Sequence, residues 1–88
     1  MFDKFLFFKT AMCPNCEEIQ EWLEDNPQIN NRCEEVDATT KEGIHKAKEY
    51  GVKGVPTIIF LKSEKRVGTI GSLEELEKVI KNKSLDDY

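Results

Sequence analysis

The sequence predicts an α/β fold with four strands and three helices in the order β-α-β-α-β-β-α. Two runs rich in apolar residues, Phe5–Phe8 and Val55–Leu61, have the nearly continuous hydrophobicity of strands that are buried on both faces. The segments that follow the first two predicted strands carry apolar residues at helical spacing. At 88 residues the chain has the length of one small domain, residues 1–88, and it contains no internal repeat or linker.

The first predicted strand spans Lys4 to Lys9, where four consecutive apolar residues are flanked by lysines. We expect it to be the central strand because both of its faces are apolar. A helix is predicted from Pro14 to about Asp25, and Asn26-Pro27 ends it. Glutamates occupy its outer positions, and its inward residues at helical spacing are Cys16, Ile19, Trp22 and Leu23.

The other three strands are less regular. A strand is predicted from about Arg32 to Asp37, with Val36 as its clear apolar residue. The strand Val55–Leu61 is entered through a proline, and the turn Ser63-Glu64-Lys65 connects it to a shorter strand, Arg66–Ile70. These last two strands should pair as a hairpin.

Two further helices complete the prediction. Thr39 or Thr40 can cap a helix that continues to about Tyr50, with Gly51 as its C-terminal cap and with Ile44 and Ala47 facing inward. Ser72-Leu73-Glu74-Glu75 is a capping box that begins the closing helix. The apolar stripe of that helix consists of Leu73, Leu76, Val79 and Ile80. Residues 82–88 are expected to form a flexible tail.

Composition and charge limit the function classes. Thirteen basic and seventeen acidic residues give a formal net charge of −4, so the sequence lacks the basic character that nucleic acids or anionic membranes require. The apolar run near the N-terminus is too short for a signal sequence or a membrane span. Three cysteines cannot form a multi-disulfide framework, and the odd number favours a reducing compartment. We therefore expect a cytoplasmic monomer without nucleic-acid or membrane partners.

The strongest chemical signal is Cys13-Pro14-Asn15-Cys16, between the first predicted strand and helix. Proline suits the first helical turn because its φ is already helical and its missing N–H needs no partner there. Cys13 is thus expected at or near the N-cap, facing solvent, where unpaired N–H groups and the helix dipole favour the thiolate. Cys16 lies one turn below on the same face. We predict that Cys13 is the nucleophile and that Cys16 resolves the mixed disulfide.

The chain combines this order of elements with Cys-Pro-x-Cys after the first strand and Val55-Pro56-Thr57 before the third. In this combination it resembles the thioredoxin/glutaredoxin superfamily, and in particular its small single-domain members. The resemblance covers nearly the whole chain. It implies a thioredoxin-like fold, a four-stranded mixed sheet with helices on both faces. It also implies that the Val55–Pro56 bond is cis, that its loop faces the cysteine pair, and that backbone groups of Val55 pair with an extended substrate.

The same resemblance assigns further roles. Pro14, Asn15 and Pro56 would support the active site, and the substrate would contact Met12, Val55, Thr57 and Gly71. No bound cofactor or metal is implied, because the redox group is the Cys13–Cys16 disulfide itself. Electrons would come from thioredoxin reductase with NADPH or from glutathione, and the substrates would be proteins that contain disulfides.

The chain departs from these relatives at several positions. Met12 stands where thioredoxins carry tryptophan, and Phe7 occupies the position of their buried carboxylate, so proton transfer at Cys16 must use water or another group. Asn15 replaces the tyrosine that is usual in glutaredoxins. Their glutathione-carboxylate site is matched only in part, by Gly71-Ser72-Leu73-Glu74, although a helix N-terminus there can receive a carboxylate.

Charged neighbours should tune the Cys13 thiol. Lys9 is the nearest cation in the sequence and would stabilise the thiolate, whereas Glu17 and Glu18 would oppose it. We predict a Cys13 pKa of roughly 6–8, below the value of about 8.5 for a free cysteine.

The other candidate ligands are isolated in the sequence. Cys13 and Cys16 would form half of a zinc site if Cys33 and His45 completed it, but zinc sites more often use two close pairs. We expect Cys33 to be a small core or edge residue, with a regulatory role if it is exposed. His45 lies among charged residues and is expected to be solvated rather than catalytic.

The sequence thus predicts a dithiol–disulfide oxidoreductase that reduces protein disulfides through Cys13 and Cys16. Small redoxins of the family it resembles donate electrons to ribonucleotide reductase, which is the most specific role that the resemblance offers. A glutathione-dependent glutaredoxin is the alternative within this class. A zinc-binding or docking module that uses the cysteine pair is the alternative from another class, and an iron–sulfur carrier ranks last.

Overall fold

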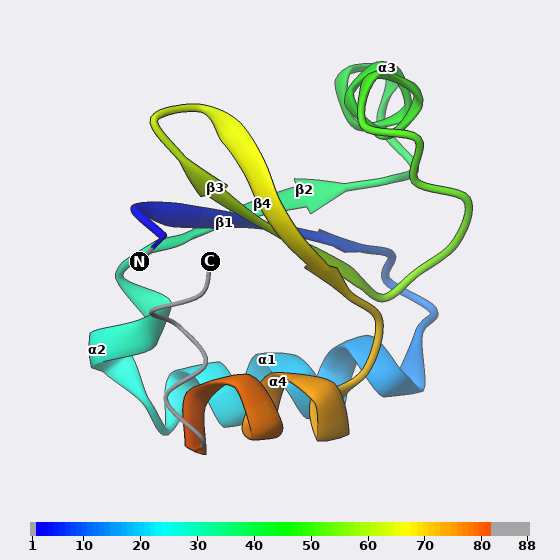
Figure 1. Ribbon diagram of the computed structural model, residues 1–88. Coiled ribbons are helices and arrows are strands. Elements are labelled where there is room, and N and C mark those ends of the chain that lie inside the picture. The colour runs from blue at the N-terminus through cyan, green and yellow to red at the C-terminus, as the bar shows by residue number, and fades with distance from the viewer. Residues whose placement is uncertain (1, 82–88) are drawn as a thin grey trace.

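The computed structural model describes residues 2–81, in which four strands form one sheet with the order β2-β1-β3-β4 (Figure 1). The strands are β1 (Lys4–Lys9), β2 (Cys33–Asp37), β3 (Thr57–Lys62) and β4 (Lys65–Ile70). β1 pairs in parallel with β2, whereas the β1–β3 and β3–β4 pairs are antiparallel. The predicted mixed sheet and its central strand are confirmed.

Helices cover both faces of this sheet, as expected. α1 (Pro14–Glu24), α2 (Pro27–Asn30) and α4 (Leu73–Lys81) lie on one face, and α3 (Lys41–Glu49) lies on the other (Figure 1). α2 is an addition to the predicted order, because Pro27 begins a new helical turn after α1 has ended, a position that suits proline. Residues 82–88, the predicted tail, lie outside the described residues. No helix within residues 2–81 combines the length and hydrophobicity that a membrane crossing requires.

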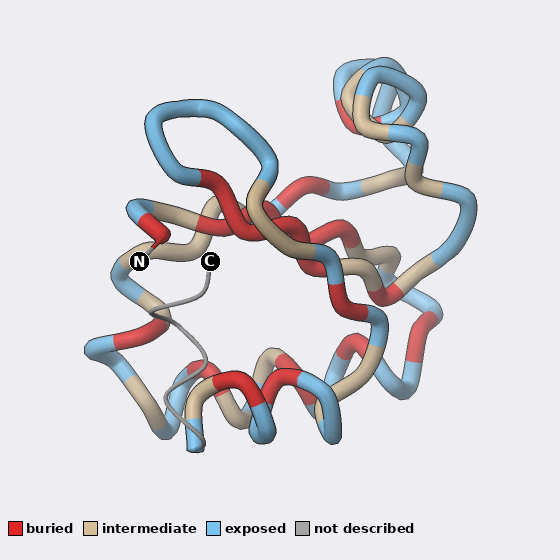
Figure 2. The backbone as a smooth tube through the Cα atoms, viewed as in Figure 1, coloured by how far each residue is buried: buried red, intermediate tan, exposed pale blue. Residues whose placement is uncertain are grey.

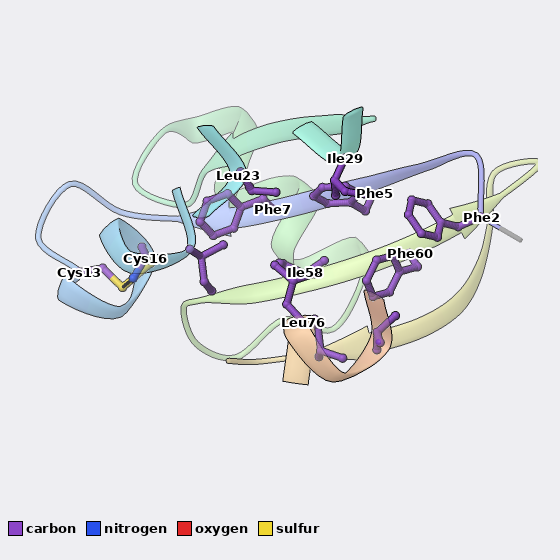
Figure 3. Close-up of a cluster of buried hydrophobic side chains, with 13 residues drawn as sticks. Phe2, Phe5, Phe7, Cys13, Cys16, Leu23, Ile29, Ile58, Phe60 and Leu76 are labelled. Atoms are coloured by element: carbon purple, nitrogen blue, oxygen red, sulfur yellow. Dashed lines mark hydrogen bonds between the residues drawn. A yellow bond between two sulfur atoms is a disulfide. The ribbon is translucent and has the colours of Figure 1, made fainter. Parts of the chain in front are cut away.

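The apolar run of β1 separates two hydrophobic clusters. Phe5 and Phe7 point toward α1, α2 and α4, and Leu6 and Phe8 point toward α3, because successive side chains of a strand face opposite ways. All four are at most 1% exposed, and Figure 2 shows the buried backbone running through the middle of the molecule. Phe2 extends the first cluster, with its ring centroid 4.8 Å from that of Phe60 (Figure 3). The core is therefore divided by the sheet into two layers.

α3 is rotated relative to the prediction. Ala47 packs against the second cluster as expected, but Ile44 is 43% exposed, so its predicted inward orientation is wrong. The residue that faces inward near the start of α3 is Gly43, which lies against the backbone of Asp37. Thr40 is the N-cap, and its hydroxyl oxygen accepts a hydrogen bond from the Gly43 N–H at 3.0 Å. Close backbone approach at a glycine, rather than burial of the largest apolar side chain, orients this helix.

Element boundaries differ slightly from those predicted. β3 begins at Thr57 rather than at Val55, because Pro56 has no N–H to donate to a strand pairing. The β3–β4 turn consists of Ser63 and Glu64, which have φ values of 51° and 67°, so β4 already begins at Lys65. Tyr50 is the C-cap of α3, and Gly51 follows it with a φ of 69°.

Candidate active site

Cys13 is the N-cap of α1, as predicted. Its backbone is extended, with φ −128° and ψ 98°, and Pro14 begins the helix. The Cys13 carbonyl oxygen accepts from the Glu17 N–H at 3.1 Å, and the Cys13 sulfur accepts from the Cys16 N–H at 3.2 Å. The sulfur thus receives one of the N–H groups that a helix leaves unpaired at its N-terminus. A negative charge on this sulfur would be stabilised by the same donor and by the helix dipole.

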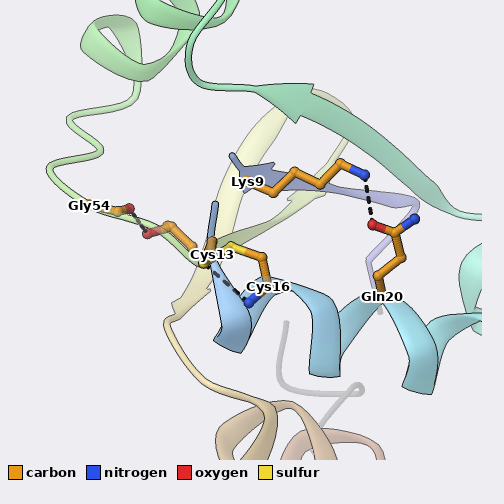
Figure 4. The surroundings of a disulfide bond; sticks show 6 residues. Lys9, Cys13, Cys16, Gln20 and Gly54 are labelled. Atoms are coloured by element: carbon orange, nitrogen blue, oxygen red, sulfur yellow. Dashed lines mark hydrogen bonds between the residues drawn. A yellow bond between two sulfur atoms is a disulfide. The ribbon is translucent and has the colours of Figure 1, made fainter. Parts of the chain in front are cut away.

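A disulfide joins Cys13 to Cys16, and their Cα atoms are 5.1 Å apart (Figure 4). Cys13 is 8% exposed and Cys16 is 2% exposed, so the expectation that Cys13 faces solvent is wrong for the oxidised protein. The Cys13 sulfur is turned toward Cys16 and the first turn of α1, while Met12, next to it, is 92% exposed. An oxidised Cys13 carries no proton, so the predicted pKa of its thiol stays a prediction.

Three segments meet at the end of the sheet where the disulfide lies. β1 leads from this end into Cys13, and the start of β3 lies there too, because Thr57 pairs with Phe8 in an antiparallel arrangement. β4 also ends there, and the next residue, Gly71, is so close to Pro56 that a Cβ atom on Gly71 would lie 3.6 Å from the Pro56 carbonyl oxygen. The sheet topology therefore brings three predicted site segments together.

The loop before β3 is held by its own hydrogen bond. The Val55–Pro56 bond is cis, as the resemblance implied. The Thr57 hydroxyl donates to the Gly54 carbonyl oxygen at 2.7 Å, a contact drawn beside the disulfide in Figure 4. Pro56 is buried, whereas Val55 and Thr57 are half-buried. Thr57 thus braces the loop, and its predicted contact with substrate stays a prediction, as do those of Met12, Val55 and Gly71.

Lys9 is held by partners that the sequence did not indicate. Its ammonium group donates to Gln20 Oε1 at 2.8 Å and lies 3.1 Å from Glu35 Oε2. In Figure 4 the Lys9 side chain extends toward Gln20, one turn beyond Cys16 on α1. The spacing of Gln20 from Cys16 places them on one helix face, but only the parallel pairing of β1 with β2 brings Glu35 to the same place. Direct stabilisation of a Cys13 thiolate by Lys9 stays a prediction.

The N-terminus of α4 is already occupied by a side chain of this protein. The Ser72 hydroxyl oxygen accepts from the Glu75 N–H at 3.1 Å, so the predicted capping box is confirmed. The Glu75 carboxylate in turn accepts from the Gly71 N–H at 3.3 Å and from the Ser72 hydroxyl at 3.2 Å. Two donors of the partial glutathione motif, the Gly71 N–H and the Ser72 hydroxyl, therefore bind an internal carboxylate.

Cys33 and His45 do not complete a metal site with the disulfide. Cys33 packs against the first cluster, whereas His45 is exposed on α3, which covers the opposite face of the sheet. Within residues 2–81 there is no group of three or more histidine, cysteine or acidic side chains arranged to hold a metal ion. Since no described residue joins Cys13 and Cys16 as a third ligand, the geometry does not support the zinc alternative.

The environment of Cys33 makes its thiol a poor nucleophile. Burial raises the pKa of the Cys33 thiol to about 12, and the negative charges of Glu35 and Glu34 act in the same direction, while Lys9 opposes them. At neutral pH the reactive thiolate form is therefore scarce. The expectation of a small residue at the edge of the core is confirmed, and the condition for a regulatory role, an exposed thiol, is not met.

A family comparison agrees with this arrangement of fold and dithiol. The sequence model of the Thioredoxin family matches residues 4–83. Among curated proteins, none has a sequence that matches this chain significantly.

Several solved structures that superpose on this chain are thioredoxins. Thioredoxin 1 from Thermosipho africanus superposes with a TM-score of 0.74 at 20% identity, covering 97% of this chain and 99% of its own. Mitochondrial thioredoxin 3 from Saccharomyces cerevisiae gives a TM-score of 0.74 at 28% identity, covering 93% of this chain and 80% of its own. Thioredoxin O2 from Arabidopsis thaliana gives 0.71 at 21% identity, with coverages of 92% and 74%. The likeness spans nearly all of the chain.

Proposed function

The chain belongs to the thioredoxin family and is a thiol–disulfide oxidoreductase, and from this we propose that it reduces disulfide bonds in other proteins. The observation that carries the proposal is the position of Cys13 and Cys16 at the N-terminus of α1, where a cis proline loop lies at the same end of the sheet. A structural disulfide would need neither the N–H donor at the Cys13 sulfur nor the adjoining loop.

In the first step the Cys13 thiolate attacks one sulfur of the substrate disulfide. A new bond forms between Cys13 and that sulfur, and the other substrate sulfur leaves as a thiolate that takes a proton from water. The Cys16 N–H and the helix dipole stabilise the attacking thiolate before this step. Met12, Pro14 and Asn15 are exposed around Cys13, so a substrate can approach from this side.

In the second step the Cys16 thiolate attacks the Cys13 sulfur. The Cys13–Cys16 disulfide forms, and the second substrate sulfur leaves and is protonated, so two electrons have passed from the dithiol to the substrate. The Cα atoms of the two cysteines are 5.1 Å apart, and only one helical turn separates them, so the backbone is already in place for this closure. The side chain at position 7, where thioredoxins carry a buried carboxylate, is a phenyl ring that cannot accept a proton. The proton of Cys16 therefore leaves through water or another group.

A dedicated reductase that uses NADPH is our proposed electron source. The hydrogen bonds from Gly71 and Ser72 to the Glu75 carboxylate support this choice over glutathione. A glutathione carboxylate at the start of α4 would have to displace an internal carboxylate and would be repelled by its charge.

An insulin-disulfide reduction assay tests the proposal and its electron source together. The protein is assayed with thioredoxin reductase and NADPH, and separately with glutathione, glutathione reductase and NADPH. We expect turnover with the first pair and little with the second. As a control, the dithiol of the same protein should be reduced by dithiothreitol and should reoxidise. If it does, and insulin is reduced with neither electron source, the proposed reduction of protein disulfides is contradicted.

Two cysteine variants test the order of the steps. Cys13→Ser should lose all reduction of insulin, because the attacking sulfur is gone. Cys16→Ser should still attack but should stop at the mixed disulfide, which a shift in mass on a non-reducing gel reveals. If the Cys13→Ser protein formed a mixed disulfide through Cys16 as fast as Cys16→Ser forms one through Cys13, the assigned roles would be wrong.

Ribonucleotide reductase is the specific electron acceptor that we propose, and the cytoplasm is the proposed location. The unpaired Cys33 thiol supports a reducing compartment. Deoxyribonucleotide formation by ribonucleotide reductase with this protein as the sole dithiol donor tests the acceptor, and fractionation of cells that express the protein tests the location.

A further inference from the structure

A hollow of about 300 Å³ lies beside the cis proline loop, on the α3 side of the active site. α3 contributes Ile44, Ala47 and Lys48. Ile44 is three positions before Ala47 and four before Lys48, so it neighbours both on the helix surface. The loop contributes Lys53, Gly54 and Val55 to the opposite wall. In Figure 1 the segment from α3 to β3 and the segment from β1 to α1 run at the same end of the sheet. Val55 lines the hollow and is followed by Pro56, so the hollow adjoins the cis proline loop at the end of the sheet where the disulfide lies.

The apolar wall of the hollow is unusually exposed. Ile44 is 43% exposed, and within residues 2–81 the only other large hydrophobic residue exposed to this degree is Met12, next to Cys13. Met12 adjoins the dithiol, and Ile44 lines the hollow together with Val55 of the cis proline loop. Gly54 has no side chain, so a partner backbone can approach the wall closely. These features suit an extended segment with an apolar side chain that fills the hollow.

The charged groups of the hollow all have the same sign. Lys48 and Lys53 line it, no carboxylate does, and neither lysine forms an ion pair with any described residue. The flank of α1 has the opposite character, because Glu17, Glu21 and Glu24 line a surface depression there. In a protein with a net charge of −4, the basic hollow is a local reversal of sign. A partner segment that bears a carboxylate would be attracted to it and repelled by the α1 flank.

We propose that this hollow binds the disulfide-bearing partner beside its reactive cysteine, through an apolar side chain in contact with Ile44 and a neighbouring carboxylate between Lys48 and Lys53. The inference rests on the proposed reduction of protein disulfides and adds the class of substrate that is preferred. Partners that carry an apolar-acidic segment next to the disulfide are reduced faster than partners with a basic one. The glutamates of α1 attract basic residues of the partner and repel acidic ones. They therefore favour binding with the acidic part of the partner at the hollow and any basic part beside α1.

Synthetic peptides test the preference. Each peptide is linked through its single cysteine to a chromogenic thiol, and carries leucine together with either aspartate or lysine, placed before or after the cysteine. Pre-reduced protein is mixed with each peptide, and the second-order rate constant of thiol release is measured by stopped flow. In at least one of the two placements the aspartate peptide should react about fivefold faster than the lysine peptide at low salt. The difference should shrink as ionic strength rises.

A matched pair of variants separates the hollow from net charge. Lys48→Glu/Lys53→Glu should reverse the preference, whereas Lys62→Glu/Lys65→Glu, with the same change of charge on the β3–β4 hairpin, should leave it in place. Ile44→Ser should slow the leucine peptides about threefold relative to alanine versions of the same peptides. Circular dichroism of each variant checks that it is folded.

Two results would overturn the inference. One is equal rates for all aspartate and lysine peptides with the wild-type protein. The other is an equal loss of preference in both double variants, which would assign the effect to net charge. These outcomes differ from a failure of the proposed function, in which wild-type protein reduces neither the peptides nor insulin.

Discussion

Gly43 places α3 on the sheet, and replacing it with alanine is a direct test of that contact. A Cβ atom on Gly43 would lie 2.7 Å from the Asp37 carbonyl carbon, closer still to its oxygen, and 2.9 Å from Thr40 Oγ1. Real Cβ atoms essentially never come within 3.0 Å of a heavy atom to which they are not bonded. The obstacle is backbone rather than the end of a flexible side chain. α3 and the end of β2 would therefore have to separate by more than about 1 Å, because the contact with the oxygen is the closest.

The cost of that separation can be set against the gain in helix propensity. Overpacking against a rigid neighbour costs roughly 3 kcal/mol at the upper end of its usual range. The shift would also weaken the Thr40 cap, in which the Gly43 N–H donates to the hydroxyl at 3.0 Å, and such a cap contributes about 1 kcal/mol. Alanine is better than glycine inside a helix by about 1 kcal/mol. We therefore expect Gly43→Ala to lower the free energy of unfolding by about 3 kcal/mol.

Replacing two other glycines with alanine provides controls, because the same methyl group is added where it meets no neighbouring atom. A Cβ atom at Gly51 meets nothing within 4 Å, but its φ is 69°, so Gly51→Ala should cost about 1 kcal/mol from backbone strain alone. A Cβ atom at Gly54 also meets nothing, and its φ is not positive, so Gly54→Ala should change stability by no more than about 0.5 kcal/mol. Urea unfolding of the oxidised proteins, followed by far-UV circular dichroism, measures all three. A Gly43→Ala protein as stable as Gly51→Ala would refute the assigned contact.

Three further predictions concern ionisable groups. Because burial raises the Cys33 pKa to about 12, iodoacetamide at pH 8 should label Cys13 of the reduced native protein much faster than Cys33, and equal labelling by mass spectrometry would contradict this. In the oxidised protein, Cys33 is the free thiol, and its pKa is higher in the folded state than in the unfolded state. Between these two pKa values the folded protein keeps the proton that the unfolded chain has lost. Stability should therefore fall as pH rises above about 8.5, and Cys33→Ala should flatten this fall in urea unfolding at pH 7 to 10. Lys46 lowers the pKa of Glu34 through a side-chain hydrogen bond, so their pair stabilises the fold above the usual glutamate pKa and this contribution is lost as pH falls through the lowered value. Lys46→Met should remove up to about 1 kcal/mol of stability at pH 7 and less at pH 3, and an equal loss at both values would contradict the pairing.

The sequence alone was sufficient for the dithiol and the elements that carry it. Pro14 restricts φ to helical values and cannot use an N–H, so the position of Cys13 at the N-cap follows from local chemistry. The apolar run of β1 and the capping box at Ser72 are equally local signals, and both are observed. Pro27 shows the limit of such reasoning, because a proline that ends one helix can also begin the next.

Contacts between elements decided the surroundings of the site. Ile44 has the spacing of an inward residue, yet Gly43 approaches the Asp37 backbone and turns Ile44 outward to line the hollow beside Val55. Likewise, the pairing of Phe7 with Glu35 brings that carboxylate to Lys9 across two strands that are distant in the sequence.

Helix and strand formation depends on residues within a few positions of one another, which the sequence displays. The direction in which a helix faces and the charges that surround a thiol depend on packing distances between segments far apart in the chain. For this protein, the sequence therefore determined where the reactive sulfurs lie along the chain. Only the tertiary structure decided which segments surround them, because that depends on how β1, β3 and β4 pair at the end of the sheet where Cys13 lies.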